Sequence, residues 1–420
     1  MNNTFTKKNI LQDNALSYLI HSLIFLLPAL ALITRNSVST VGFLFLLAGM
    51  LCWRAAKPGL LRHLTEVRTV LTAFGVSFAF ALAGLLLHPD IQLRALEKPS
   101  RIFFSVTVLL AVLALRPSRK ALWAGLIAGT VGGAVFICYQ RWGLGVDRPG
   151  GLINSITFGD IALCMGMMCL AAVLDFKGRQ VLWPALGALA GLLGSVATGT
   201  RGGWVAILFA AVLFIKYGHF LRSRVSKALA ALVMVLLVST YFIDQTGTRG
   251  RVLQGVYDVT AYFDGTVRLT NVGVRFELWK GGLALAAQHP WRISTHKEIR
   301  AELEQEVAAG RLQPFVLEAE HFHNDMMHVL VYGGIPGLLV YLFTMIAPFL
   351  FFLRILKTHE SASPSVIAPA LAGMLLVTGY FSFGLTEVIF WSILSTMFYV
   401  QMLFLLMGFC LNAQDERIAP

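Results

Sequence analysis

The sequence predicts an all-α polytopic membrane protein with about twelve transmembrane helices and one long loop between helices nine and ten. Hydrophobic residues make up 57% and charged residues only 13% of its 420 residues. The mean hydropathy is +0.71, which is too high for a soluble domain of this length. Apolar runs of about 17 residues also recur along the chain, and this length suffices to cross a hydrocarbon core.

The predicted spans fall into two groups separated by the one long hydrophilic segment. In order they are 17–34, 38–53, 69–87, 102–115, 121–139, 157–174, 181–197, 204–215, 227–243, 326–352, 366–385 and 388–411. Residues 1–244 therefore carry helices one to nine, residues 245–322 form a loop domain, and residues 323–420 carry helices ten to twelve with a short tail. A connection of this length is expected to have structure of its own.

The distribution of Lys and Arg predicts the orientation in the membrane. An even number of spans puts both termini on one side. The short segments on that side carry 18 of the 34 basic residues, whereas the short loops on the other side carry 7. Basic residues mark the cytoplasmic side. Both termini are therefore expected in the cytoplasm and the long loop outside it.

The net charge of +12 and the five cysteines narrow the possible functions. Arginines on the outer side are not needed for orientation, so they suggest an anionic ligand. Basic runs interleaved with aromatic residues are missing, and nucleic acid is not an expected partner. All five cysteines fall in or beside apolar spans, which predicts no disulfide framework and no cysteine metal site.

Two stretches of the long loop have the pattern of amphipathic helices. They are residues 274–287 and 299–309, and we expect both to lie across the membrane surface. Arg275 lies in the first stretch, one helical turn before Trp279. Taken alone, Arg275 fits an ordinary surface ion pair as well as a ligand site.

A polar pair, His323 and Asn324, precedes the tenth span. Gly334 and Gly337 follow in the run HNDMMHVLVYGGIPG. Gly333 and Gly337 have the spacing of small-residue helix contacts, and Pro336 is expected to kink the helix where neighbours can satisfy the freed backbone group. Interfacial helix capping would explain His323 and Asn324 equally well. His321 and His328 are close by, and the exposed turn favours His323 as the functional histidine.

Further cations are predicted on the outer side. Arg201 lies in the short turn at 198–204, where its guanidinium is accessible among glycines and threonines; a snorkelling arginine at a helix end is the alternative. Four other cations are candidates for binding a phosphate or an acidic sugar: Lys98, Arg101, Arg141 and Arg148. Asp160, early in the sixth span, is expected to pair with one of the arginines.

These residue types together suit transfer from a lipid-linked sugar pyrophosphate. An enzyme outside the cytoplasm has no ATP and needs a donor that already carries a leaving group. An imidazole can take the proton of the acceptor hydroxyl, and arginines can stabilise the pyrophosphate. The long loop has no Asp-x-Asp pair. We therefore expect no metal and no cofactor.

Three motifs resemble the bacterial O-antigen ligases, which share a superfamily with O-antigen polymerases and protein O-oligosaccharyltransferases. The motifs are Thr200-Arg201-Gly202-Gly203-Trp204, Arg275 followed by Trp279, and His323-Asn324 with Gly334 and Gly337. Thr200 replaces the usual Ser of the family. The Gly-Tyr-Gly turn that commonly follows the arginine helix is not found after His289.

The resemblance implies a GT-C-like glycosyltransferase of lipopolysaccharide biosynthesis in a Gram-negative inner membrane. It would transfer O-antigen from undecaprenyl pyrophosphate to the lipid A-core oligosaccharide, at the periplasmic face of the phospholipid membrane, without metal and with inversion. His323, Arg201 and Arg275 would be catalytic, with Asn324 among the substrate-binding residues.

Two alternatives to a ligase follow from the sequence. A polymerase or a protein O-oligosaccharyltransferase would share the donor chemistry and differ in its acceptor. A lipid-linked sugar flippase is less favoured, because transporters show repeats and ionisable residues near the bilayer midplane, whereas the charges here gather at one face.

Overall fold

A computed structural model describes residues 2–88, 91–200, 202–217, 248–358 and 364–418, with a few single positions between 227 and 242. All regular elements within these ranges are helical. The helices before residue 218 are α1 (Asn2–Ala29), α2 (Ser37–Leu51), α3 (Trp53–Arg62), α4 (Leu64–Leu87), α5 (Glu97–Phe104), α6 (Val106–Leu115), α7 (Lys120–Cys138), α8 (Ser155–Ala172), α9 (Leu182–Ala197) and α10 (Val205–Tyr217). The later helices are α12 (Thr248–Phe263), α13 (Asn271–Gln288), α14 (His296–Ala308), α15 (Asp325–Thr358), α16 (Pro364–Gly384) and α17 (Ile393–Ile418).

Eight helical stretches in the described ranges are long and apolar enough to cross a membrane. They are Leu64–Leu87, Leu93–Leu115, Lys120–Gly143, Ser155–Asp175, Gly178–Ala197, Asp325–Thr358, Pro364–Gly384 and Ile393–Glu416. The pair α2 and α3, bent by 84°, makes a ninth if it is one span, and Ala15–Ala29 and Gly202–Phe214 are shorter apolar helices. The class of multi-pass helical membrane protein is thus confirmed. The number twelve stays a prediction, because most of the expected span at 227–243 lies outside the described residues.

Helices α8, α16 and α17 form the centre of the bundle. Between 89% and 94% of their apolar windows is buried, against 22% for α4. A helix that is apolar all round has to be surrounded by other helices or by lipid. Small residues permit close contact between α8 and α9, where a Cβ on Gly191 would lie 2.5 Å from the Ala162 carbonyl oxygen. Close backbone approach of this kind is how helices associate in lipid.

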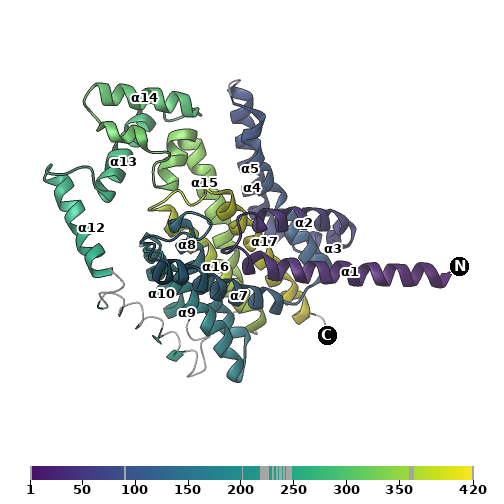
Figure 1. Cartoon of the computed structure of the whole chain (residues 1–420). Helices are drawn as coiled ribbons and strands as arrows, with labels where there is room; N and C mark the ends of the chain where they lie inside the picture. The colour runs from purple at the N-terminus through teal and green to yellow at the C-terminus, as the bar shows by residue number, and fades with distance from the viewer. Residues whose placement is uncertain are drawn as a thin grey trace.

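The segment from 248 to 322 has a small hydrophobic core of its own. Leu278 and Leu285 of α13 pack with Ile299 and Leu303 of α14, and Val331 of α15 completes the cluster. Figure 1 shows α13 and α14 grouped together beside the upper part of α15. The two helices predicted at 274–287 and 299–309 are therefore confirmed as α13 and α14, and their position across the membrane surface stays a prediction. Helix α12 was not predicted.

Helix α15 is broken at Gly334, and the preceding loop fills the break. Gly334 has φ 61° and ψ −165°, a conformation that is essentially restricted to glycine. Pro336 has no N–H, so the carbonyl of Tyr332 is free, and the Ser294 amide donates to it at 2.8 Å. The Ile335 amide donates to Pro290 at 2.7 Å. The predicted kink is confirmed, and the loop supplies the partners that the helix lost.

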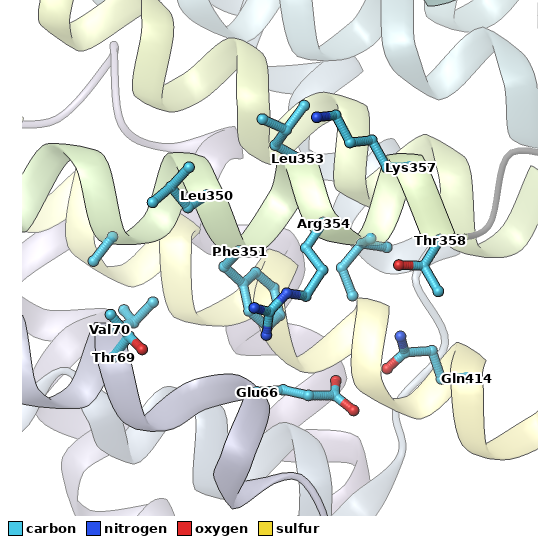
Figure 2. Close-up of a pocket in the computed structure, with 12 residues that line it drawn as sticks. Glu66, Thr69, Val70, Leu350, Phe351, Leu353, Arg354, Lys357, Thr358 and Gln414 are labelled. Carbon is cyan, nitrogen blue, oxygen red and sulfur yellow. The ribbon is translucent and has the colours of Figure 1, made fainter.

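The far end of α15 meets a different set of charges. The carboxylate of Asp415 accepts hydrogen bonds from Arg62 and Arg116, and His63 lies 3.0 Å from it. A cavity of about 570 Å³ adjoins this end. Figure 2 shows Arg354 of α15 entering that cavity, with Glu66 of α4 facing it. About thirty residues of α15, roughly 45 Å at 1.5 Å per residue, separate this end from His323.

Candidate functional site

His323 has a strained backbone that three surrounding contacts hold in place. Its φ is 46°, one of two positive values among non-glycine residues in the described ranges. Asn324 caps α15, since its Oδ1 accepts from the Met327 amide at 2.9 Å, and its Nδ2 donates to the Leu385 carbonyl at 3.0 Å. The indole of Trp279 donates to the Phe322 carbonyl at 2.9 Å. Left-handed geometry outside glycine often marks functional sites.

Glu387, which the sequence reasoning missed, is the direct partner of His323. The Nδ1 atom of His323 is hydrogen-bonded to the Glu387 carboxylate at 3.1 Å, and Nε2 of His321 lies 3.3 Å from the other carboxylate oxygen. Glu387 is 6% exposed. Burial acts to raise the pKa of Glu387, but the hydrogen bond and charge of His323 and the charge of His321 outweigh it and hold the pKa below its ordinary value.

A signal for Glu387 was present in the sequence. The residue lies in the very short turn between two apolar spans, where a carboxylate is costly unless it is paired. The lack of metal-loop spacing among the carboxylates of the long loop gives no information about this turn. An ionisable residue in so short a turn, on the side predicted for His323, would have been the reason to include it.

One cavity brings several predicted site residues together. It measures about 770 Å³, and His323, Arg275, Arg148, Thr200 and Thr386 all line it. These residues come from α13, from the loops before α8, α10 and α15, and from the turn after α16. Residues that are more than a hundred positions apart in the sequence thus meet at one cavity. The cavity therefore has the guanidinium groups of Arg275 and Arg148 and the imidazole of His323 in its lining.

Arg275 and Arg148 have no hydrogen bond or ion pair with any described residue. Burial lowers the pKa of Arg275, the charge of Glu387 raises it, and the charge of Arg148 lowers it further. A guanidinium nevertheless remains protonated under all ordinary conditions. Two unpaired cations at one cavity wall repel each other and favour an anion between them.

Arg201 itself lies outside the described residues, but its turn is fixed on both sides. Thr200 donates to the Ser155 carbonyl at 3.1 Å and accepts from Thr198 at 2.9 Å. A Cβ on Gly202 would lie 2.2 Å from the Thr386 hydroxyl oxygen. The hydroxyl kept by threonine at position 200 thus fastens the turn, and Thr200 and Gly202 both line the cavity of His323.

The other predicted cations lie elsewhere. Arg101 is paired with Glu97 at 2.7 Å, and Arg141 with Asp147 at 2.7 Å. Lys98 donates to the Trp391 carbonyl at 3.3 Å. Together with His328 it lines a separate apolar cavity of about 380 Å³. The structure therefore brings Arg148, but not these three, to the cavity of His323.

Asp160 lies beneath the turn of Arg201. Its Oδ1 is buried without a hydrogen-bond partner, and a Cβ on Gly203 would lie 2.4 Å from it. No arginine of the described ranges forms an ion pair with Asp160. The expected pairing of Asp160 with an arginine stays a prediction, since Arg201 is not among the described residues.

His321, His323 and Glu387 are also the described residues that could hold a metal ion. One ligand atom from each lies within 4.8 Å of the others. Two imidazoles and a carboxylate are a donor set that zinc accepts. The same atoms form the histidine–carboxylate contacts described above, so a metal there would occupy the nitrogen atoms that could otherwise carry protons.

The fold and the site define a multi-pass helical membrane protein with a cavity that Arg275, Arg148 and Asp258 line beside a histidine–glutamate pair. Residues 186–342 match the family model described as O-antigen ligase. Over this stretch the chain is thus similar to the O-antigen ligases. A relative from Haemophilus influenzae, described as an uncharacterized protein, is 20% identical over 359 residues, which cover 84% of this chain and 89% of the relative.

Proposed function

We propose that this protein transfers an O-antigen glycan from undecaprenyl pyrophosphate to the lipid A-core oligosaccharide. The observation that carries the proposal is the single cavity lined by His323, Arg275 and Arg148. It supports a group transfer that needs one base and several cations. The family match supports the glycan as the group transferred.

The contacts of His323 suggest the role of each nitrogen. Nδ1 donates to Glu387, so the proton is on Nδ1 and the lone pair of Nε2 is left to accept a proton. The acceptor hydroxyl loses its proton to Nε2 while its oxygen attacks the anomeric carbon. The bond from that carbon to the pyrophosphate oxygen breaks, and a single displacement inverts the anomeric centre.

Cations stabilise the leaving pyrophosphate. Arg275 and Arg148 line the cavity without other partners among the described residues, and Arg201 belongs to the turn whose neighbours line it. Removing one such donor costs about 10²- to 10³-fold in turnover in well-studied enzymes. Arginines would thus perform the task that a divalent metal performs in other transferases, and the reaction is proposed to be metal-independent.

The positions of the charges support a periplasmic site in the inner membrane. Arg62, Arg116 and Asp415 meet at one end of the bundle, and their short segments are the ones predicted to be cytoplasmic. His323 and Arg148 lie on segments predicted for the other side. Both termini would then lie in the cytoplasm.

Reconstitution tests the proposal. The purified full chain is placed in proteoliposomes with undecaprenyl-pyrophosphate-linked O-antigen and lipid A-core, with chelator present, and the higher-mass conjugate is quantified. We expect product from the wild type and none from His323→Ala. Loss of activity with chelator would exclude the metal-free mechanism. Glycan added to a second O-antigen unit or to a peptide, with no conjugate on lipid A-core, would instead identify a polymerase or a protein O-oligosaccharyltransferase.

A matched pair of arginines tests the cavity assignment. Arg275→Ala is expected to lower turnover about 10²- to 10³-fold, because an unpaired cation at the pyrophosphate is lost. Arg141→Ala removes an arginine that is already paired with Asp147, and turnover should stay within about twofold. Equal losses in both variants would contradict the assignment, and turnover is measured in the same assay.

A further inference from the structure

A second cavity lies on the other side of the histidine pair. It measures about 430 Å³, and His321, Trp391, Tyr332, His296 and Arg300 line it. His323 lines the cavity of the arginines and His321 lines this one, and their ring centroids are 4.5 Å apart. The two imidazoles, with Glu387 bonded between them, therefore stand between the two cavities. None of the predicted donor-binding cations lines the second one.

Aromatic rings form the wall of this cavity. Trp391 is 48% exposed, although His321 packs against it at 5.5 Å and His328 at 5.6 Å between ring centroids. Tyr332 stacks on His296 with planes 5° apart, and the two are hydrogen-bonded at 3.0 Å. Exposed rings that are held in fixed positions lose little entropy when a ligand packs on them.

The backbone of Trp391 is held by its own turn and by Lys98. The Trp391 amide donates to the Val388 carbonyl at 2.9 Å, and Lys98 donates to the Trp391 carbonyl at 3.3 Å. Val388 in turn donates to Glu387 at 3.1 Å. The aromatic wall and the carboxylate that orients His323 are thus parts of one short turn.

The polar groups around the rings are mixed in sign. Arg300, whose guanidinium also donates to Glu304 and to the Leu317 carbonyl, offers its remaining N–H groups beside His296, and the exposed carboxylates of Glu318 and Glu320 offer acceptors. An anionic ligand would meet these carboxylates and be disfavoured. A carbohydrate fits better, because its C–H face packs on an aromatic ring while its hydroxyls both donate and accept hydrogen bonds.

We infer that this second cavity, built on Trp391, Tyr332 and His296, binds the saccharide of the acceptor. The inference rests on the proposed function and adds to it where the acceptor docks. The donor pyrophosphate lies against Arg275 and Arg148, the acceptor saccharide lies against Trp391, and the imidazole pair lies between them. The saccharide is thereby bound beside His321, and its accepting hydroxyl extends past His321 to Nε2 of His323, at the cavity where the anomeric carbon of the donor lies.

Direct binding tests the inference without relying on turnover. The probe is water-soluble core oligosaccharide released from lipopolysaccharide by removal of its lipid, titrated into the purified full chain and followed by calorimetry and saturation-transfer NMR. We expect binding to the wild type and a loss of affinity of about tenfold or more in Trp391→Ala. Trp391→Phe keeps an aromatic face and should stay within about threefold.

Two further variants guard against a merely structural effect. Trp291→Ala removes a tryptophan that is 69% exposed and lines none of the cavities described here, so affinity should not change. Arg300→Gln alters an exposed side chain on α14 and should weaken binding about threefold or more. If Trp391→Ala fails to fold, Arg300→Gln and the wild-type NMR contacts decide the matter.

The outcomes separate the acceptor site from the proposed function. In the transfer assay, Trp391→Ala should raise KM for lipid A-core and leave KM for the O-antigen donor unchanged. Unchanged acceptor KM and unchanged oligosaccharide affinity in an active Trp391→Ala enzyme would overturn the inference alone. Oligosaccharide binding that depends on Trp391 in a protein without transferase activity would keep the site and remove the proposed reaction. Binding of a peptide in place of the oligosaccharide would overturn the saccharide assignment.

Discussion

Glu387 connects the two histidines that stand between the cavities. Its carboxylate fixes the ring of His323 through Nδ1 and lies close to Nε2 of His321. Partners of this kind hold an imidazole in one tautomer and orientation, and their loss reduces catalysis far more than it reduces binding. In the proposed mechanism Glu387 is a positioning residue and does not touch substrate.

Glu387→Gln is therefore expected to lower turnover about 100-fold and to leave both KM values within about threefold. The amide can still accept a hydrogen bond but carries no charge to stabilise the imidazolium. Glu97→Gln is the matched control, since Glu97 is a half-exposed carboxylate paired only with Arg101 among the described residues. Steady-state kinetics in proteoliposomes measure the difference, and equal kinetics in the two variants would argue against a positioning role.

The pKa of Glu387 also predicts how stability depends on pH. Because its pKa in the folded protein is lowered, its contribution to stability is fully present above the ordinary pKa of a glutamic acid, about 4.3. The contribution is lost only as the pH falls through the lowered value. The difference in Tm between wild type and Glu387→Gln should therefore shrink as the pH falls below about 4.3. A difference that disappears near pH 6 would contradict this assignment.

At the scale of elements, α15 and the loop before it form one unit. The loop at 290–294 forms hydrogen bonds with the Tyr332 carbonyl and the Ile335 amide, which have no helical partner because of the break at Gly334 and Pro336. A Cβ at position 334 would lie 2.6 Å from the Pro290 carbonyl oxygen. The positive φ at position 334 and the close approach of the Pro290 carbonyl both require glycine there.

Gly334→Ala is expected to destabilise the protein by about 1–3 kcal/mol from backbone strain, and the clash with Pro290 adds to this. The matched control is Gly75→Ala in α4, where an added Cβ meets nothing within 4 Å, and a glycine in a helix interior costs about 0.5–1 kcal/mol relative to alanine. Thermal unfolding in detergent should show a lower Tm for the first variant and an equal or higher Tm for the second. A stable Gly334→Ala protein would mean that the break in α15 can be closed.

Hydrophobic periodicity was enough to predict most helices. It did not predict the local backbone geometry at the break in α15. Apolar runs located the helices that became α4, α8, α15 and α16, because length and hydropathy are properties of the segment itself. Helix α12 was missed, although Val252, Val256 and Val259 recur in it at helical spacing. The position of Gly334 in the kink depends on the loop that packs against it, which no local pattern records.

The candidate site was predicted in part. His323, Arg275 and Arg148 share a cavity because three distant segments meet, and the motifs had singled out two of them. Arg101 and Arg141 were included on charge alone, although the sequence places Glu97 one helical turn before Arg101 and Asp147 six residues after Arg141. Glu387 and Trp391 belong to a turn of few residues, and their importance comes from contacts with His321 and His323, which only the fold creates.

At the scale of the whole molecule, the orientation in the membrane can be tested with paired lysines. Lys297 in α14 and Lys177 in the turn before α9 are both exposed. Four of the five native cysteines are buried, and Cys138 is half-buried, so background labelling should be low. In intact spheroplasts, Lys297→Cys should react with an impermeant maleimide and Lys177→Cys should react only after permeabilisation. The reverse pattern would invert the proposed topology, and the unsubstituted chain is the control.

The break in α15 sets a rule for building chimeras with related proteins. Exchange of a loop between relatives is a common way to transfer acceptor preference, and it treats the loop as separable from the membrane helices. Here Pro290 and Ser294 complete the backbone bonding of Ile335 and Tyr332, so an exchange that stops at residue 322 leaves a buried helix with unmatched polar groups. A workable graft has to carry residues 332–337 together with the loop, and its boundary belongs one turn beyond Gly337, inside the membrane helix.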